Sequence, residues 1–408
     1  MTKNVWMLNH YAKKFPMAGG TRHHGLARGL HRHDMDTTIF TAEEVTGAPN
    51  RSDGEPSDGV TFVQVPTRSY QGNGLGRILN MAGFAWRTTR LGWHPERHGL
   101  TSPDVVIGST PHPFAALAAW AIARHHHVPF ILEVRDLWPE SMVAILGMSR
   151  RHPLVLVLGA MEKFLYSHAD RIVGVLEGIG DHAQMRVGRR APEVTWVPNG
   201  VSMALLPDVT PVTPPGGEFR VVYTGSHGPP NSLDTVLAAA EILQHDDDSS
   251  LPPIRFDLYG DGVVKKQLIK DAQRRGLTNV HFHDPVPKDE VYRILAGADA
   301  TVLLLPRLYL WRFGISPNKL FDYLAAARPT ILAVDAPGDP VTKASAGFTA
   351  TGEDPVDLAA KIRQLRALPL VERQAMGMRG REYVAANHDM PRLADRLAAA
   401  INSTTRRR

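Results

Sequence analysis

The chain has 408 residues, of which 21% are charged and 43% hydrophobic; these are ordinary globular values, and the length indicates two domains. It contains no cysteine, so structural disulfides, thiolate metal sites and a cysteine nucleophile are excluded. The net charge of +5 favours an anionic partner, such as a phosphorylated ligand or a lipid headgroup. No zinc-finger or RNA-binding motif points to nucleic acid.

Short apolar strands alternate with helical patterns along nearly the whole chain, which predicts parallel sheets with crossover helices. In the first half, strands are expected at residues 4–8, 37–41, 61–65, 105–108, 130–134, 171–175 and 194–197. The first of these resembles a buried strand more than a signal peptide, and no apolar run reaches the ~20 residues of a membrane span. We therefore expect a cytoplasmic protein.

Two segments of the first half differ from their surroundings. Residues 49–58 are polar and rich in turn-forming residues, which predicts a loop. Residues 69–98 combine apolar and aromatic side chains with arginines, which is typical of a helix with one buried and one solvated face. The same composition suits surface helices that touch an anionic membrane or a lipid-linked acceptor, so peripheral attachment at the inner face of a membrane stays open.

In the second half, strands are expected at residues 219–224, 254–259, 280–283, 300–304 and 330–333. Residues 206–217 contain prolines and glycines that interrupt a sheet, so they indicate an interdomain linker. The predicted class is α/β, with one domain at residues 1–205 and a second at 218–385. Residues 386–408 have leucine and alanine at helical spacing and end in arginines, so we expect a helix and basic tail packing back on the first domain.

Ligands of open α/β sheets bind beyond the carboxyl ends of the strands, so the loops there are the first candidates. Gly19 and Gly20 precede a predicted helix and let the backbone approach a phosphate or sugar closely, although a plain turn is an equal alternative. Glu133, Arg135 and Asp136 surround the end of the fifth predicted strand. Because unpaired charges are costly to bury, these three either form a structural network or face a cleft.

Two loops of the second domain have the residues of a phosphate site. They follow the strands at 219–224 and 254–259, and the N–H groups of their small residues can bind a pyrophosphate or cap a helix. Lys265 follows the second loop by about one helical turn and supplies a positive charge. The small loop residues are Gly225, Ser226, His227, Gly260 and Gly262.

The segment 316–323 is the most informative in the chain. Ser316 and Asn318 stand at the start of a predicted helix, where free N–H groups attract anions, and Lys319 adds a positive charge. Asp322 follows one turn later, where a carboxylate can accept hydrogen bonds from a ribose diol. The segment therefore predicts a site for a nucleoside diphosphate.

Clusters of potential metal ligands lack suitable spacing. The three histidines at 125–127 point in different directions around a helix end, and the three aspartates at 246–248 lie in a polar loop. No nucleophile elbow of a Ser/His/Asp triad and no complete P-loop is present. We therefore expect neither a metal nor a cofactor.

Three motifs carry a family resemblance. They are Glu133-Val134-Arg135-Asp136-Leu137-Trp138-Pro139-Glu140-Ser141, Pro198-Asn199-Gly200-Val201 and Ser316-Pro317-Asn318-Lys319-Leu320-Phe321-Asp322-Tyr323-Leu324-Ala325-Ala326. Together they resemble the retaining glycosyltransferases of family 4, in particular the branch with bacterial N-acetyl-L-fucosamine transferases of surface-polysaccharide assembly. The resemblance implies the GT-B fold, in which two doubly wound Rossmann-like domains face a central cleft. It also implies a metal-independent hexosyltransferase that moves a UDP-linked N-acetylated hexosamine or deoxyhexosamine, with retention, to a lipid-linked or saccharide acceptor.

The resemblance also assigns roles to single residues. Catalytic roles fall on Arg135, Asp136, Lys265 and Lys319. Donor binding falls on Gly225, Ser226, His227, Gly260, Gly262, Val286, Ser316, Asn318, Lys319 and Asp322, with Val286 at the base edge and Asp322 at the ribose. The acceptor-side loop comprises Gly19, Gly20, Arg22 and Glu133.

The sequence departs from the family pattern at two places. The family often has two glutamates, where this chain has Gly314 and the shorter Asp322. His227 and Gly228 stand near the positions where many members have an arginine and a lysine. Two alternatives remain open: a nucleotide-sugar epimerase of the same fold, against which the motif at 133–139 argues, and a non-catalytic partner of a transferase.

Overall fold

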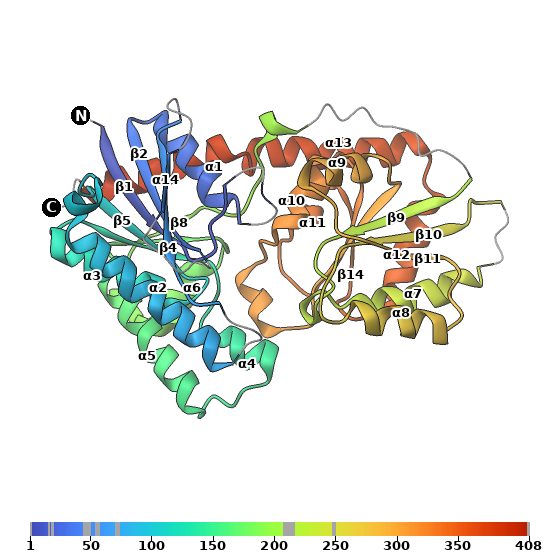
Figure 1. Cartoon of the computed structure of the whole chain (residues 1–408). Helices are drawn as coiled ribbons and strands as arrows, with labels where there is room; N and C mark the ends of the chain where they lie inside the picture. Colours follow the sequence, from blue (N-terminus) through green and yellow to red (C-terminus); the bar gives the residue numbers. More distant parts are fainter. Residues whose placement is uncertain are drawn as a thin grey trace. The chain divides into compact units, whose positions relative to one another are not determined.

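The computed structural model describes residues 2–14, 17, 20–43, 50–53, 58–69, 74–206, 217–246 and 250–405 (Figure 1). The chain divides into two compact units: unit 1 comprises residues 1–199 and 390–408, and unit 2 comprises residues 200–389. Each unit is a mostly parallel sheet with helices on both faces. The predicted class, two doubly wound α/β domains, is confirmed.

Unit 1 is built on an eight-stranded sheet with the order β3-β4-β2-β1-β5-β6-β7-β8, in which only β3 is antiparallel to its neighbour. Its strands are β1 (Lys3–Leu8), β2 (Met35–Glu43), β3 (Asn50–Asp53), β4 (Val60–Pro66), β5 (Val105–Ser109), β6 (Phe130–Val134), β7 (Arg171–Gly174) and β8 (Val194–Trp196). Its helices are α1 (Arg22–His31), α2 (Leu75–Trp93), η1 (Pro95–His98), α3 (Pro113–His126), α4 (Glu140–Leu146), α5 (Pro153–His168), α6 (Ile179–Val187), η2 (Gly188–Arg190) and α14 (Met390–Thr405). Helices α1 and α14 pack against each other and share one apolar core with the sheet, while α3 packs between α2 and α5.

Unit 2 is built on a six-stranded parallel sheet with the order β11-β10-β9-β12-β13-β14. Its strands are β9 (Phe219–Thr224), β10 (Ile254–Tyr259), β11 (Val280–His283), β12 (Ala300–Leu304), β13 (Thr330–Ala333) and β14 (Gly347–Ala350). Its helices are η3 (Met203–Leu205), η4 (Pro229–Asn231), α7 (Leu233–Gln244), α8 (Lys265–Arg274), α9 (Lys288–Ala296), η5 (Tyr309–Phe313), α10 (Asn318–Ala325), α11 (Pro340–Ala344), α12 (Pro355–Ala367) and α13 (Leu370–Asn387). One core lies beneath α7, α8 and α12, and a second lies beneath α9, α10, α11 and α13.

Two strands were not expected from the sequence. Residues 50–53, within the predicted loop at 49–58, form the edge strand β3, which pairs with β4 alone and therefore lacks the apolar pattern of a central strand. Strand β14 begins at Gly347, where an added Cβ atom would lie 1.9 Å from the carbonyl oxygen of Thr330. Only glycine permits that close approach of two backbones.

The boundary between the units differs from the expected linker. The chain passes from unit 1 to unit 2 at residues 199–200 and returns at 389–390. Residues 200–206 belong to unit 2 because their backbone bonds to the end of α13: the Val201 N–H donates to His388 O (3.0 Å) and the Met203 N–H to Asp389 Oδ1 (3.1 Å). Most of the expected linker, residues 207–216, lies outside the described residues.

The C-terminal helix α14 packs on α1 in unit 1. The two helices approach closely at Gly29, where an added Cβ atom would lie 2.3 Å from the Cβ atom of Ala394. The Lys3 ammonium at the start of β1 donates to Asn402 on α14 (2.7 Å). Leu393, Leu397 and Ile401 fill the core between the helix and the sheet, so the end of the chain is part of the N-terminal unit.

The strand orders place a topological switch point in each unit. In unit 1 the strand order reverses its direction between β1 and β5: β2 and β4 follow on one side, and β6, β7 and β8 on the other. In unit 2 it reverses between β9 and β12. Ligands of such sheets bind outside the carboxyl ends of the strands at this point. The residues that follow β9 and β5 are therefore the first candidates for a site.

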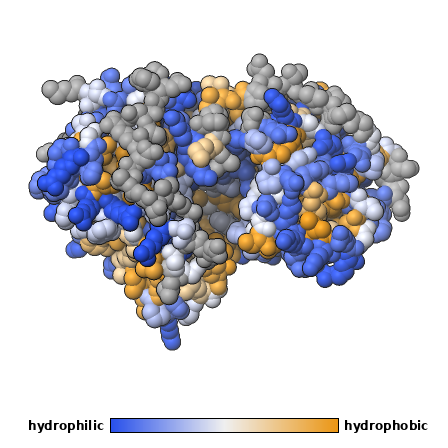
Figure 2. Space-filling model, in the orientation of Figure 1, coloured by the Kyte–Doolittle hydropathy of each residue, from blue (hydrophilic) through white to orange (hydrophobic). Residues whose placement is uncertain are grey.

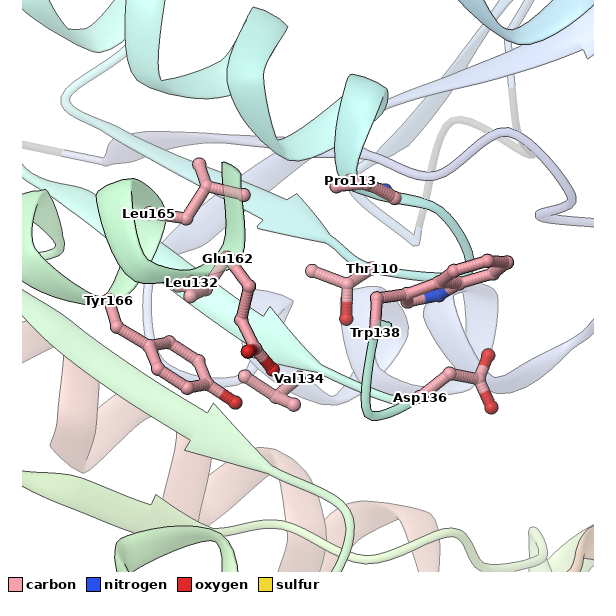
Figure 3. A pocket seen from close by; sticks show the side chains of 9 residues that line it. All are labelled: Thr110, Pro113, Leu132, Val134, Asp136, Trp138, Glu162, Leu165 and Tyr166. Atoms are coloured by element: carbon pink, nitrogen blue, oxygen red, sulfur yellow. The ribbon is translucent and has the colours of Figure 1, made fainter. Parts of the chain in front are cut away.

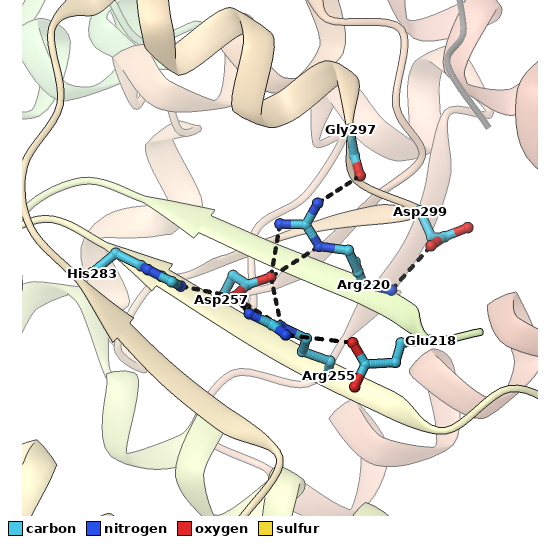
Figure 4. A network of polar contacts seen from close by, with 7 residues as sticks. All are labelled: Glu218, Arg220, Arg255, Asp257, His283, Gly297 and Asp299. Carbon is cyan, nitrogen blue, oxygen red and sulfur yellow. Dashed lines mark hydrogen bonds and ion pairs between the residues drawn. The ribbon is translucent and has the colours of Figure 1, made fainter. Parts of the chain in front are cut away.

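An ion network around the buried Asp257 links β9, β10 and β11 (Figure 4). Asp257 is fully buried and accepts hydrogen bonds from Arg220 (2.9 Å), Arg255 (3.0 Å) and His283 (2.8 Å). Burial alone would raise the pKa of Asp257, but these hydrogen bonds outweigh it and hold the pKa below its usual value. Because the carboxylate is already saturated by its neighbours, the network serves the sheet and offers no acceptor to a ligand.

Candidate functional site

Lys319 lies at the switch point of unit 2, where the start of α10 meets the end of β9. Its ammonium donates to Tyr223 Oη (2.8 Å) and to Asn231 Oδ1 (2.5 Å), and it stands 4.7 Å from the centroid of the Tyr223 ring. Among the described residues it forms no ion pair with a carboxylate. Burial lowers the pKa of Lys319 to about 8. This cation is held in place by neutral partners and retains its attraction for an anion.

Three glycines, of which Gly225 lies next to Lys319, let the loops after β9 and β10 pack closely. Gly225 has φ of +149°, and an added Cβ atom there would lie 3.0 Å from Lys319 Nζ. A Cβ atom at Gly260 would lie 1.9 Å from Gly225 O, and one at Gly262 would lie 2.4 Å from His227 O. The loops after β9 and β10 therefore pack backbone against backbone, which residues with side chains would prevent.

The expected donor residue His227 is in the interior. Its side chain is fully buried, with the rings of Tyr223 and Phe282 about equally distant (6.0 and 6.1 Å between centroids). Its backbone N–H donates to Asp261 O (2.8 Å), so that group is already paired. The neighbouring Ser226 carbonyl accepts from Tyr223 Oη (2.7 Å). In this structure His227 is a packing residue beneath the loop, not a group presented to a ligand.

Lys265, expected to be a catalytic cation, holds two loops together. Its ammonium donates to Gly260 O (2.9 Å) and His283 O (2.8 Å) and lies 3.3 Å from Asp284 Oδ1. An ammonium has three donors, and each has a protein acceptor here. Lys265 thus joins the carboxyl ends of β10 and β11, whereas Lys319 has no carboxylate partner within the described parts of the chain.

Asp322 lies one turn into α10 and is held from α9. Its Oδ2 accepts from Lys288 Nζ (2.5 Å) and its Oδ1 accepts from Tyr292 Oη (2.7 Å). Burial, together with Asp322, raises the pKa of Tyr292 above its usual value, so the phenol remains a donor. Val286 precedes Lys288 by two residues and is partly exposed, so the expected base-edge residue lies just before the helix that holds Asp322.

The remaining donor-side positions lie at the start of α10. Asn318, its first residue, is exposed, and Ser316 is partly exposed. Gly314 precedes them with φ of +95°, a backbone conformation that disfavours any side chain. The glutamate that the family often has would be strained at this position, so the backbone conformation here favours the glycine that the chain has.

In unit 1, Arg22 and Glu133 form a buried ion pair. Arg22 Nε donates to Glu133 Oε1 (3.0 Å), and both residues are almost fully buried (3% and 2% exposed). The Arg22 guanidinium also donates to the carbonyls of Val197 (2.7 Å) and Pro198. His23 Nε2 lies 2.6 Å from Glu133 Oε2. This network joins α1, β6 and the chain after β8, which differs from the acceptor contact expected of Arg22 and Glu133.

A small pocket lies at the carboxyl ends of β5 and β6 (Figure 3). The centres of water molecules can occupy about 10 Å³ of it, the space of about one water. Asp136 lies at the exposed rim of the pocket. Glu162 is a second acidic lining residue. Burial raises its pKa to about 8, although the Arg186 guanidinium donates a hydrogen bond to it (2.6 Å). The lining residues are Thr110, Pro113, Leu132, Val134, Asp136, Trp138, Glu162, Leu165 and Tyr166.

The other expected residues of unit 1 lie around this strand end. Arg135 is partly exposed, and its backbone N–H donates to Thr110 Oγ1 (3.1 Å). Gly20 has φ of +67°, and its carbonyl accepts from the Lys13 N–H (3.0 Å), which closes the turn after β1. Gly19 lies outside the described residues. Of the three charges at the end of β6, Glu133 is therefore structural and Asp136 faces outward.

Sequence reasoning missed four side chains that shape the donor-side site. They are Tyr223, Asn231, Lys288 and Tyr292. Tyr223 is fully buried in an apolar strand and looks like an ordinary core residue. Lys288 stands two residues after the expected base-edge residue Val286, and this closeness in sequence was a local signal that could have found it. Within the described residues, no three His, Asp or Glu side chains are grouped as metal ligands would be.

Comparison with known proteins extends over both units. Residues 18–200 match the model of the glycosyl transferase 4-like domain, and residues 218–367 match the model of the glycosyl transferases group 1. Together the two models match most of the chain, so it is a glycosyltransferase with a 4-like domain followed by a group 1 domain. The 4-like match lies almost entirely in unit 1, and the group 1 match lies in unit 2.

Individual relatives of this chain are distant. WcaI of Escherichia coli, named a colanic acid biosynthesis glycosyl transferase, is 22% identical over 64% of this chain, and the chain spans 64% of its length. Sucrose-phosphate synthase from Thermosynechococcus elongatus has a TM-score of 0.76 at 14% identity, with full coverage of both chains. HepE of Anabaena, solved with UDP and glucose, has a TM-score of 0.66 at 12% identity, with 98% of this chain and 100% of HepE covered. These similarities confirm the expected GT-B fold of two Rossmann-like domains.

Proposed function

We propose that the protein transfers a sugar from a UDP-linked donor bound by unit 2 to a saccharide or lipid-linked acceptor bound by unit 1. One observation carries the proposal: Lys319, a partly buried cation with no carboxylate partner among the described residues, stands at the start of α10 beside the glycine loop after β9. The family matches and the UDP found with HepE support it. The name of WcaI supports a role in polysaccharide biosynthesis.

The chemistry follows from the leaving group. When the bond between the anomeric carbon and the diphosphate breaks, negative charge develops on the diphosphate, and fixed cations and helix N–H groups stabilise it. Lys319 and the first N–H groups of α10 fill these roles in the proposal, so the reaction needs no metal ion. The proposed donor is a UDP-linked N-acetylated hexosamine or deoxyhexosamine, transferred with retention, as in N-acetyl-L-fucosamine transferases.

The direct test is a donor screen. The protein is incubated with UDP-sugars and a lipid-diphosphate or saccharide acceptor, UDP release is measured, and the anomeric configuration of the product is read by NMR. Turnover that persists in excess EDTA supports metal independence. Epimerisation of a donor without an acceptor would favour the epimerase, and donor binding without transfer or hydrolysis would favour a non-catalytic partner. The proposal fails if no nucleoside diphosphate binds.

Donor binding is expected to weaken as the pH rises above about 8. The pKa of Lys319 is lowered to about 8 in the free protein, so the lysine is charged below that pH and neutral above it. A bound diphosphate favours the charged form of Lys319, so above pH 8 the lysine takes up a proton when the donor binds. Donor affinity therefore falls by up to about tenfold for each pH unit above 8. Calorimetry of UDP-N-acetylglucosamine binding in buffers of different ionisation enthalpy measures this uptake. Equal heats in all buffers at pH 9 would contradict the role of Lys319.

We also propose peripheral contact of unit 1 with an anionic membrane. Helix α2 exposes Leu79, Trp86 and Trp93, with the Arg90 guanidinium 5.7 Å from the Trp86 ring. Figure 2 shows further hydrophobic surface at the lower end of unit 1, where α4 and α5 meet. The exposed apolar residues there are Ile145, Leu146, Leu156 and Val157, with Arg150 and Arg151 between the helices. Within the described residues, no helix is long and apolar enough to cross a membrane.

We expect the protein to sediment with vesicles of phosphatidylcholine and phosphatidylglycerol at low salt and to be released as salt increases, because the attraction is screened. The double variant Leu146→Ser, Leu156→Ser removes apolar side chains that are already exposed, so it should reduce binding and leave the fold intact. Val371→Ser, at an equally exposed position on α13 of unit 2, is the matched control. Absence of binding at low salt would refute the membrane contact.

A further inference from the structure

The carboxylate of Asp322 is fixed by two side chains from another helix. Lys288, the first residue of α9, and Tyr292, one turn later on the same helix, each donate to a different oxygen of Asp322. Lys288 also stands 5.3 Å from the centroid of the Tyr292 ring, so the two donors support each other. We call this arrangement of Lys288, Tyr292 and Asp322 the α9 clamp. All of its members lie in unit 2.

The α9 clamp leaves a defined part of the carboxylate available. An ionised carboxylate has about four lone-pair positions, two on each oxygen. Lys288 uses one on Oδ2 and Tyr292 uses one on Oδ1, so about one position remains on each oxygen. Two acceptor positions on neighbouring oxygens match the two O–H donors of a vicinal diol.

The clamp also fixes the geometry that such a contact requires. Asp322 is 7% exposed, and its short side chain, one methylene less than the family's glutamate, limits its reach. With both oxygens held, the carboxylate cannot rotate away from a ligand. Because α9 begins two residues after Val286, the clamp also ties the ribose position to the expected base-edge position.

We propose that Lys288 and Tyr292 are positioning residues that hold Asp322 for a ribose diol and so make the donor site selective for ribonucleotides over deoxyribonucleotides. This inference rests on the proposed function, since it assumes that unit 2 binds a nucleoside diphosphate. A purely structural ion pair between α9 and α10 predicts a different result, because its loss would lower stability and leave the choice between the two nucleotides unchanged.

The test compares UDP with 2′-deoxy-UDP by titration calorimetry in the full-length protein and in variants. The wild type should bind UDP roughly tenfold or more tightly than 2′-deoxy-UDP, as expected for one hydrogen bond to a charged acceptor. Lys288→Met and Tyr292→Phe should weaken UDP binding and bring this ratio to within about threefold, while 2′-deoxy-UDP binding changes little. Lys266→Met, at an exposed lysine on the preceding helix α8, is the control and should keep the wild-type ratio.

The possible outcomes separate the two claims. If the wild type binds neither nucleotide, the proposed function fails, and the ribose assignment fails with it. If the wild type binds UDP but does not discriminate, or if Tyr292→Phe and Lys288→Met both keep the full ratio, the α9 clamp has no positioning role, although the donor site stands. Tyr292→Phe removes only a hydroxyl, so it keeps the test valid if Lys288→Met fails to fold.

Discussion

Replacement of Lys319 by methionine is expected to lower turnover by roughly 10²- to 10³-fold, the usual effect of removing one preorganised group that stabilises transition-state charge. Lys319 forms no ion pair among the described residues, and its partners are the neutral Tyr223 and Asn231. Methionine has a similar length and no charge to bury, so the melting temperature should stay the same or rise. A loss of kcat with retained stability is the signature of a residue that serves the reaction.

Two further lysines serve as comparisons in the same assay of UDP release. Lys266→Met changes an exposed residue and should leave turnover unchanged. Lys265→Met removes the bonds to Gly260 and His283, so it should lower the melting temperature as well as turnover. If Lys319→Met keeps wild-type kcat and donor affinity, Lys319 does not contact the diphosphate.

Replacement of Glu133 by alanine is expected to destabilise unit 1 by about 3–5 kcal/mol, the cost of leaving a buried charge without its partner. Arg22 would keep its carbonyl contacts to Val197 and Pro198 but lose its counter-charge in the interior. The free energy of unfolding is measured by urea denaturation, with a probe in unit 1. The double variant Arg22→Met, Glu133→Leu removes both charges and should lose less stability than the single variant.

The lowered pKa of Glu133 predicts how the stability of unit 1 changes with pH. Burial would raise the pKa of Glu133, but His23 and Arg22 outweigh it and hold the pKa well below its usual range. The stabilisation is therefore present above the unfolded pKa of about 4.3 and is lost as the pH falls through the lower folded value. Glu133→Gln should flatten this acid limb of the stability profile. A loss below about 1 kcal/mol in Glu133→Ala at pH 7 would show that the pair is not needed.

The part of the site that could be predicted is the part encoded locally. Lys319 and Asp322 follow a helix start within one turn, so neighbouring residues alone suggested an anion site with an acid beside it. Tyr223, 96 positions away from Lys319, and Lys288, 34 positions away from Asp322, reach the site only through the fold. A single sequence contains no signal for such distant pairings.

The role of Glu133 also could not be predicted from its neighbours in sequence. Its sequence position, at the end of a buried strand beside Arg135 and Asp136, fits a cleft as well as it fits a core network. The choice depends on Arg22, 111 residues earlier, which reaches Glu133 from α1. The strands themselves were predicted well because alternation and apolar runs are local, while β3 and β14 were missed because short edge strands lack that pattern.

The return of the chain into unit 1 at residue 390 affects the order in which the protein folds during synthesis. Unit 2 is an insertion within unit 1, so a ribosome completes unit 2 before it supplies α14, and domains generally fold as they become complete. Until α14 emerges, the surface of α1 that receives Leu393, Leu397 and Ile401 stays uncovered. The N-terminal unit is therefore the last to be completed, and a short truncation at the C-terminus damages the fold at the opposite end of the sequence.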